Sequence, residues 1–236
     1  MVSLIEQIEQ VEQIERDIAP IEVAVSNMGA NVRFSITETT ARVYQMVWEM
    51  ACFSGVLMGR EVTKVMPPRS RGTIIFIGAT ASLRGREGFA AIAGAKHAPQ
   101  ALAQSMVRAL RLKGIHVAHP IINGAIDTDF IRTNCPDRYA TRDQGGILNP
   151  DHIAAAYGQV HRQPRDLWTH EAELLLTAAA KGHTNSTSLA YCSRDKTRIC
   201  PNHVSSWGQP QPQLLNRALV GFLRRFHHPH VCANFG

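Results

Sequence analysis

The chain has 236 residues, of which 44% are hydrophobic, and its formal net charge is +6. No apolar run approaches the roughly 20 residues that span a bilayer, and five scattered cysteines do not make a disulfide framework. Residues 173–236 hold seven Lys or Arg and two Asp or Glu, so the rest of the chain is nearly neutral, which argues against a nucleic-acid-binding face there.

An amphipathic helix is predicted for residues 3–18, where apolar side chains recur every three or four positions. These are Leu4, Ile8, Val11, Ile14 and Ile18. We expect it to pack on a sheet, with a short coiled coil as the alternative. The acidic residues in this stretch differ from the basic start of a secretory signal. We therefore expect a cytoplasmic protein with no membrane partner.

A strand and a long helix follow. Residues 21–25 (IEVAV) are typical of a short buried strand, and Ser26–Ala30 forms a turn. Thr39 or Thr40 is suited to cap a helix that runs to about Val65, where Pro67 and Pro68 end it.

The stretch Gly72–Thr128 predicts a strand, a helix and a second strand. The strands are Thr73–Ile77 and Ile115–Ile122, and the helix is Glu87–Lys113. Short connections make this a βαβ unit with parallel neighbouring strands. Pro99 falls inside the helix, where proline is tolerated only in a first turn or at a kink. The helix is rich in small residues and carries one lysine that looks buried, Lys96.

A further helix is expected at about His152–His161, capped by Asp151. Beyond about Ala172 no period is sustained, and Ser, Thr, Asn, Gln and Pro are frequent, which predicts loop or disorder. A short basic helix is expected at Leu214–Phe226. We therefore predict an α/β domain over residues 1–172, with a partial doubly wound parallel sheet, and a basic polar tail over residues 173–236.

Five segments in this order and spacing resemble the short-chain dehydrogenase/reductase family of Rossmann-fold, NAD(P)-dependent oxidoreductases. They are VAVSNMGA, GTIIFIGATAS, FAAIAGAKHA, KGIHVAH and NGAIDT. The resemblance covers about residues 8–172 and implies NAD or NADP as cofactor and a small carbonyl or alcohol as substrate. It also implies a homo-oligomer, because the two long helices, 39–65 and 87–113, commonly form the oligomer interface in this family.

The resemblance also assigns roles. Asn27 and Gly29 match the family's Asn-Asn-Ala-Gly turn beneath the cofactor, and Gly124 and Thr128 match its Pro-Gly-x-x-x-Thr loop beside the nicotinamide. Lys96 matches the lysine of Tyr-x-x-x-Lys, which binds the ribose hydroxyls and lowers the tyrosine pKa. That chemistry needs the two residues four apart, because this spacing places both on one helix face.

The sequence departs from the family at the catalytic positions. The expected tyrosine is Ile92, and the expected serine is Ala79, with Thr80 and Ser82 as the hydroxyls that could substitute. The family's glycine-rich pyrophosphate turn has no counterpart, since no glycine precedes Gly29. By the family pattern the first three strands are absent, so the 21–25 strand is expected to have an open edge that invites another chain.

Three function classes follow. The first is an oxidoreductase whose activity is impaired or lost, with Lys96, Thr80 and Ser82 as its catalytic candidates. The second is a non-catalytic remnant that self-associates through helices 39–65 and 87–113. The third is a nucleic-acid or protein binder that uses the basic tail. Cysteines and histidines of the tail, from Cys192 to Cys232, match no tight zinc spacing, so we expect no metal.

Overall fold

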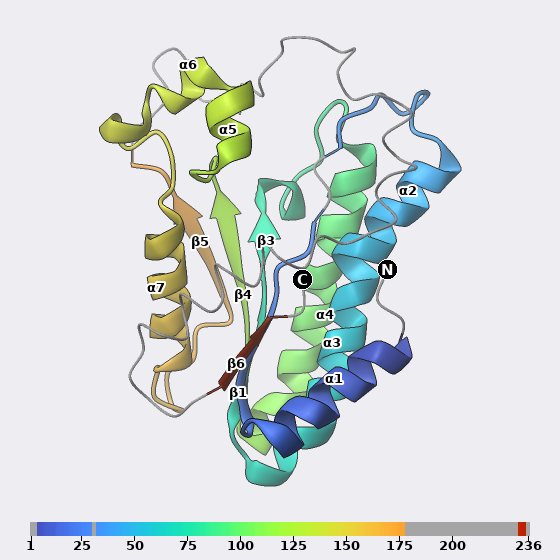
Figure 1. Ribbon diagram of the computed structural model, residues 1–236, viewed down its shortest axis with the longest axis vertical. Helices are drawn as coiled ribbons and strands as arrows, with labels where there is room; N and C mark the ends of the chain where they lie inside the picture. Colours follow the sequence, from blue (N-terminus) through green and yellow to red (C-terminus); the bar gives the residue numbers. More distant parts are fainter. Residues whose placement is uncertain (1–3, 30–31, 178–230, 235–236) are drawn as a thin grey trace.

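The computed structural model describes residues 4–29, 32–177 and 231–234, which form a parallel sheet with helices on both faces (Figure 1). Across the sheet the order is β6, β1, β2, β4, β5, and the short β3 continues β2 alongside β4. The strands are β1 (Ile21–Ser26), β2 (Gly72–Phe76), β3 (Gly78–Ala79), β4 (Ile115–Asn123), β5 (Glu171–Leu175) and β6 (Val231–Asn234). The predicted α/β class with a doubly wound parallel sheet is confirmed.

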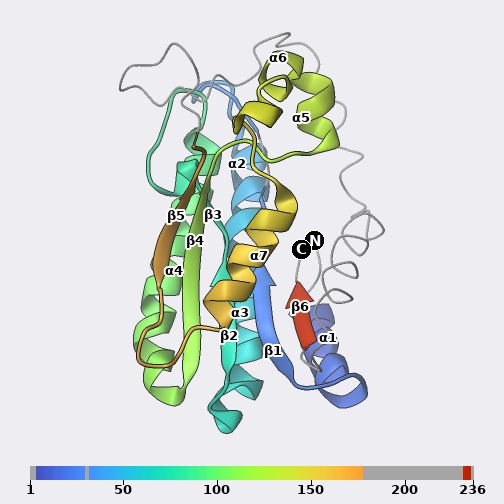
Figure 2. The same cartoon turned by 90° about the vertical axis from the view of Figure 1, so that its left-hand side faces the viewer.

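The helices divide between the two faces of the sheet. Helices α1 to α4 lie on one face, and α7 lies on the other (Figure 1 and Figure 2). Their bounds are α1 (Leu4–Asp17), α2 (Ala41–Trp48), α3 (Ser54–Val65), α4 (Ala90–Leu110), α5 (Asp129–Asn134), α6 (Pro136–Tyr139) and α7 (Pro150–His161). Within the described ranges, no helix has the length and apolar character to cross a membrane.

Alternation along β2 builds a core on each face, because successive side chains of a strand point to opposite sides. Ile74 and Phe76 pack with residues of α1, α3 and α4. Ile75 and Ile77 pack instead with side chains that include Tyr157 of α7. Phe76, Ile74 and Ile75 are fully buried, so β2 is the central strand of both cores.

Helix α1 is fastened to the start of the sheet by an ion pair as well as by its apolar face. Val11 is buried in the same core as Ile74, which confirms that this amphipathic helix packs within the domain. Glu15 accepts two hydrogen bonds from the Arg69 guanidinium, at 2.7 and 3.1 Å, and a third from the Ile21 N–H at 2.8 Å. The carboxylate therefore joins α1, β1 and the turn before β2.

The long helix predicted to follow Thr39 or Thr40 is interrupted. Thr40 caps it as predicted, since its hydroxyl oxygen accepts a hydrogen bond from the Val43 N–H at 3.2 Å. Between α2 and α3, however, Glu49–Phe53 forms a π-helical turn. Such a turn shifts the helix phase by one residue and depends on tertiary packing, so periodicity alone does not reveal it.

Two further details of the predicted helices are corrected. Helix α4 runs through Pro99, which is buried in its interior rather than in a first turn. Helix α7 begins one residue before the predicted cap: the Asn149 side chain accepts a hydrogen bond from the Asp151 N–H at 2.8 Å, and Pro150 occupies the first helical position. Asn and Pro are favoured at these two positions.

The sheet extends beyond residue 172. Strand β5 crosses that boundary and pairs with β4 in parallel register, from His119 opposite Glu171 to Asn123 opposite Leu175. The expectation of loop or disorder from Ala172 is therefore wrong for the first residues of the segment. The alternately exposed pattern of β5 is that of an edge strand.

The outer edge of β1 is also covered by this chain. Strand β6 pairs with β1 in parallel, with Ala24 opposite Ala233 and Val25 opposite Asn234. The expectation of an open edge on the 21–25 strand is therefore wrong. The predicted helix at Leu214–Phe226 and the tail cysteines and histidines up to His230 lie outside the described residues.

Candidate functional site

Lys96 lies at the carboxyl edge of the sheet, where the turns after β1 and β2 meet α4. It is 8% exposed. Its ammonium donates hydrogen bonds to the carbonyl oxygens of Met28 at 2.8 Å and Ile77 at 3.3 Å. These two carbonyls belong to the segments that follow neighbouring strands, so the lysine ties the strand ends to the helix.

Burial changes the acidity of this lysine. Removal from water lowers the pKa of the Lys96 ammonium to about 8, because a low dielectric disfavours the charged form. The glycine at position 29 makes room for it, since a Cβ there would lie 3.1 Å from Lys96 Cε and 3.2 Å from Nζ. The ammonium has a third proton, which is available to a group placed at this edge.

The position four residues before Lys96 holds no proton donor. Ile92 is 8% exposed and packs in an apolar cluster with Val47, Ala51 and Ala95. Ala79, at the expected serine position, has only a methyl group. Ile92 and Ala79, which the resemblance places at the family's tyrosine and serine positions, are therefore hydrocarbon in this chain. Ile92 forms part of the contact between α2 and α4.

The two hydroxyls proposed as substitutes are engaged in local structure. The Thr80 hydroxyl donates to Asn123 Oδ1 at 2.6 Å, and Asn123 Nδ2 donates to Glu173 Oε1 at 2.6 Å. Ser82 is fully buried, and its Oγ accepts a hydrogen bond from the Ala79 N–H at 3.0 Å. Each hydroxyl therefore stabilises the turn after β3, and the chain from Thr80 to Glu173 links β3, β4 and β5.

The remaining predicted site residues lie at the same edge. Asn27 is exposed directly after β1. At Gly124 a Cβ would approach side-chain carbons of Leu176 and Leu148 to 2.9 and 3.0 Å, so a glycine lets the loop after β4 pack closely. Thr128 caps α5, with its Oγ1 accepting from the Ile131 N–H at 3.3 Å.

A buried histidine next to this edge escaped the sequence analysis. His119 of β4 is fully buried, and its Nδ1–H donates to the Phe76 carbonyl at 2.8 Å. Burial lowers the pKa of His119, and the charge of Lys96 acts in the same direction. Gly78 accommodates the ring, because a Cβ there would lie 2.7 Å from His119 Nε2. The sequence signal that could have identified it is a histidine within a largely apolar predicted strand.

Comparison with known proteins identifies the family of this fold. The family model described as short chain dehydrogenase matches residues 3–138. A crystal structure of a short-chain dehydrogenase from Rhodopseudomonas palustris is 42% identical, with 73% of this chain and 70% of that chain covered and a TM-score of 0.60. The chain belongs to the short-chain dehydrogenase family. No curated protein matches it.

More distant members of the short-chain dehydrogenase fold superpose at similar quality. ElxO with NADP bound is 17% identical, with 73% of each chain covered and a TM-score of 0.63. A halohydrin dehalogenase bound to ethyl (2S)-oxiran-2-ylacetate is 18% identical, with 75% of this chain and 77% of that chain covered and a TM-score of 0.64. At these identities the likeness establishes the Rossmann-like fold alone.

The carboxyl edge around Lys96 thus offers a cation and backbone carbonyls, and the side chains at Ile92 and Ala79 are hydrocarbon. The Lys96 ammonium fits the hydroxyls of a nicotinamide ribose, the group that the family lysine binds. No cluster of three or more His, Cys, Asp or Glu side chains suited to a metal ion occurs among residues 4–29, 32–177 and 231–234.

Proposed function

We propose that this chain is a short-chain dehydrogenase family member whose oxidoreductase activity is lost or severely impaired. One observation carries the proposal: Lys96 keeps its place, while Ile92 stands where the family's tyrosine transfers a proton and Ala79 stands where its serine orients the substrate carbonyl. Carbonyl reduction requires a group that donates a proton to the forming alkoxide. The Thr80 hydroxyl donates its proton to Asn123 Oδ1, and Ser82 is fully buried in the turn with its Oγ accepting from the Ala79 N–H, so neither is placed to take over.

The cofactor assignment, NAD or NADP, is part of the same proposal. Lys96 with Asn27 would hold the nicotinamide ribose, and the loop Gly124–Thr128 would border the nicotinamide, which supplies hydride chemistry when bound. We expect weak cofactor binding, because the Lys96 ammonium is 8% exposed and already donates to the carbonyls of Met28 and Ile77. A small carbonyl or alcohol substrate is expected only if activity persists.

Titration with NAD(H) and NADP(H), followed by thermal unfolding, tests this proposal. A competent site with ligand at a hundred times its Kd would add about 2.7 kcal/mol of stability. We expect no comparable shift at millimolar cofactor, and no cofactor-dependent turnover of a panel of carbonyls and alcohols. A saturable shift that disappears in Lys96→Ala, together with turnover, would contradict the proposal and restore the active enzyme.

A second candidate function, self-association, is favoured by the aromatic surface of α2 and the π-helical turn. Tyr44, Trp48 and Phe53 are 41%, 37% and 36% exposed. The Trp48 and Phe53 rings stack with their centroids 6.0 Å apart. Exposed aromatic side chains gathered on one helix are typical of protein interfaces, and α2 lies beside α4 (Figure 1).

We expect Trp48→Glu to reduce the molar mass measured by light scattering after gel filtration, because it places a charge in the proposed contact. Phe130→Glu is the matched control, since Phe130 is 55% exposed on α5, away from this helix pair. A wild-type protein that remains monomeric at high micromolar concentration, or equal effects of both variants, would contradict self-association through α2 and α4.

Binding of nucleic acid or protein through the basic tail stays a prediction, because residues 178–230 of that tail lie outside the described residues. Deletion of residues 178–230 tests it. Loss of a salt-sensitive affinity for nucleic acid would support it, whereas absence of any such affinity in the full chain would remove it. The cytoplasmic location and the two-part division at residue 172 also stay predictions.

A further inference from the structure

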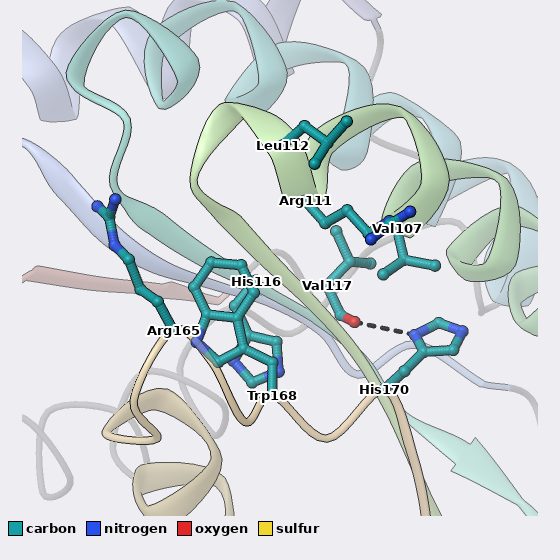
Figure 3. Close-up of a pocket in the computed structure, with 8 residues that line it drawn as sticks. All are labelled: Val107, Arg111, Leu112, His116, Val117, Arg165, Trp168 and His170. Atoms are coloured by element: carbon teal, nitrogen blue, oxygen red, sulfur yellow. Dashed lines mark hydrogen bonds between the residues drawn. The ribbon is translucent and has the colours of Figure 1, made fainter.

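A cavity of about 420 Å³ lies at the end of the sheet opposite to Lys96, next to the start of β4 (Figure 3). The end of α4 and the turn after it form one wall, where Leu112 is 84% exposed. The segment 165–170 forms the other wall, and Val117 of β4 lies between them (Figure 3). We call this space the distal cavity. It is independent of the carboxyl-edge site and of the proposed function.

The charges around the distal cavity are of one sign. Its lining includes two guanidinium groups, Arg111 and Arg165, and no carboxylate. In the described part of the chain, neither guanidinium forms a salt bridge. Arg165 donates a hydrogen bond to the Ser70 carbonyl. Arg111 is exposed, and its side chain is drawn on the same side of the cavity as Val107 (Figure 3). Its guanidinium therefore borders apolar side chains and has no ion-pair partner among the described residues.

An ordered aromatic wall faces these groups. The Trp168 and His116 rings are stacked, with centroids 4.9 Å apart and an interplanar angle of 2°. His116 Nε2–H donates to the Thr169 carbonyl at 2.8 Å, and His170 Nδ1–H donates to the Val117 carbonyl at 2.9 Å. These bonds to the backbone fix both imidazoles, so the wall is set before any ligand arrives.

Two ring nitrogens of the lining histidines are left without a partner. His116 Nδ1 and His170 Nε2 are buried and have no hydrogen bond within the described residues, and a carboxylate oxygen of Glu171 lies 3.8 Å from His170 Nε2. A buried polar atom of this kind is uncommon in a folded protein unless water or a ligand meets it. These nitrogens therefore add polar positions to a cavity lined by guanidinium groups and apolar side chains.

We propose that the distal cavity binds a small organic carboxylate with an apolar body. The Arg111 guanidinium pairs with the carboxylate, because its planar fork matches two carboxylate oxygens. Trp168, Leu112 and Val107 contact the apolar body. Arg165 has one donor committed to Ser70, so it contributes positive charge more than direct contact. A cavity of this size lies within the range of sites for small molecules.

Calorimetric titration of the full chain with phenylacetate tests the proposal, with 2-phenylacetamide as its neutral counterpart and inorganic phosphate as an anion without an apolar body. We expect saturable binding of phenylacetate alone. Arg111→Ala should weaken it roughly tenfold or more, since charged hydrogen bonds of this kind correspond to that range. Arg42→Ala is the control, because it removes an exposed guanidinium on α2 and should leave affinity unchanged.

Quenching of Trp168 fluorescence provides the second readout, measured in a protein that carries Trp48→Phe and Trp207→Phe. We expect phenylacetate to quench the remaining tryptophan, with the same Kd as the calorimetric value. If Arg111→Ala fails to fold by circular dichroism, Arg111→Lys replaces it, and loss of the planar fork should still weaken binding. The proposal is overturned if phenylacetate does not bind saturably, if the amide or phosphate binds as tightly, or if Arg42→Ala has the same effect.

Discussion

Phe76→Ala is expected to lower the free energy of unfolding by about 3–5 kcal/mol, the range for removing a buried aromatic side chain. Phe76 is fully buried in the centre of the sheet. Its ring lies against two glycines of α3: a Cβ at Gly55 would be 3.5 Å from the ring, and one at Gly59 would be 3.3 Å from it. The two glycines carry no side chain that could move into the cavity left by alanine.

Urea unfolding followed by circular dichroism measures this loss, and the midpoint of thermal unfolding should fall by roughly 10 °C. Phe130→Ala is the matched control, because Phe130 is 55% exposed and its removal should change stability little. If both variants lose similar free energy, the ring of Phe76 is not packed as described. The result also bears on the site, because Phe76 immediately precedes Ile77, whose carbonyl holds Lys96.

The elements that the sequence predicted well are those with strong local signals. The strand Ile115–Asn123 is a nearly continuous apolar run, and Thr40 precedes the start of α2 by one residue. Lys96 stood out because a buried-looking lysine interrupts a helix of small residues. Its place at the carboxyl edge followed from the βαβ order, since parallel strands end at a common edge.

The elements that were missed depend on contacts between distant residues. Strand β5 has the sequence Glu-Ala-Glu-Leu-Leu, which has little strand propensity, and it is defined by pairing with β4. Strand β6 is defined in the same way by β1. The two carbonyls that hold Lys96 belong to Met28 and Ile77, whose side chains carry no signal for a cation. A backbone partner has no signature in the sequence, so this part of the site required the fold.

The catalytic candidates Thr80 and Ser82 also show that the sequence does not reveal contacts formed in the fold. Thr80 and Ser82 have the right chemistry, but their hydrogen bonds to Asn123 and to the Ala79 N–H emerge only in the folded turn. Asn123 replaces a proline of the family pattern, and its amide is what connects Thr80 to Glu173. The substitution at that position therefore changes the role of a neighbouring hydroxyl.

The pH dependence of stability is expected to reveal the buried ammonium of Lys96. Its pKa is lowered to about 8 in the folded protein, from an ordinary value of 10.5. Between these values the unfolded chain binds a proton that the folded chain has released. Stability therefore rises with pH across this window. Below pH 8 both states are protonated, and the full cost of the buried charge, about 3 kcal/mol, is present and constant.

Urea unfolding of the wild type and Lys96→Met at intervals from pH 7 to pH 10.5 measures this effect. The difference in unfolding free energy between the two should change by about 3 kcal/mol over the window, in favour of the wild type as pH rises. The unfolding free energy of the variant is subtracted from that of the wild type because other groups also titrate in this range. Burial raises the pKa of Cys52 and Tyr157, and ionisation of such groups lowers the stability of the folded protein at high pH. Both terms are common to the two proteins.

Lys113→Met separates burial from the mere loss of an amine, because Lys113 is exposed in the turn after α4. Its difference from the wild type should change less with pH than that of Lys96→Met, because no buried charge is removed. A flat difference for Lys96→Met would mean that the ammonium reaches water and is not held by the carbonyls of Met28 and Ile77. The difference in unfolding free energy between the wild type and Lys96→Met could also rise with pH in the absence of cofactor and become flat with millimolar NAD(H). That result would mean that bound cofactor keeps Lys96 charged, as expected for an occupied ribose site.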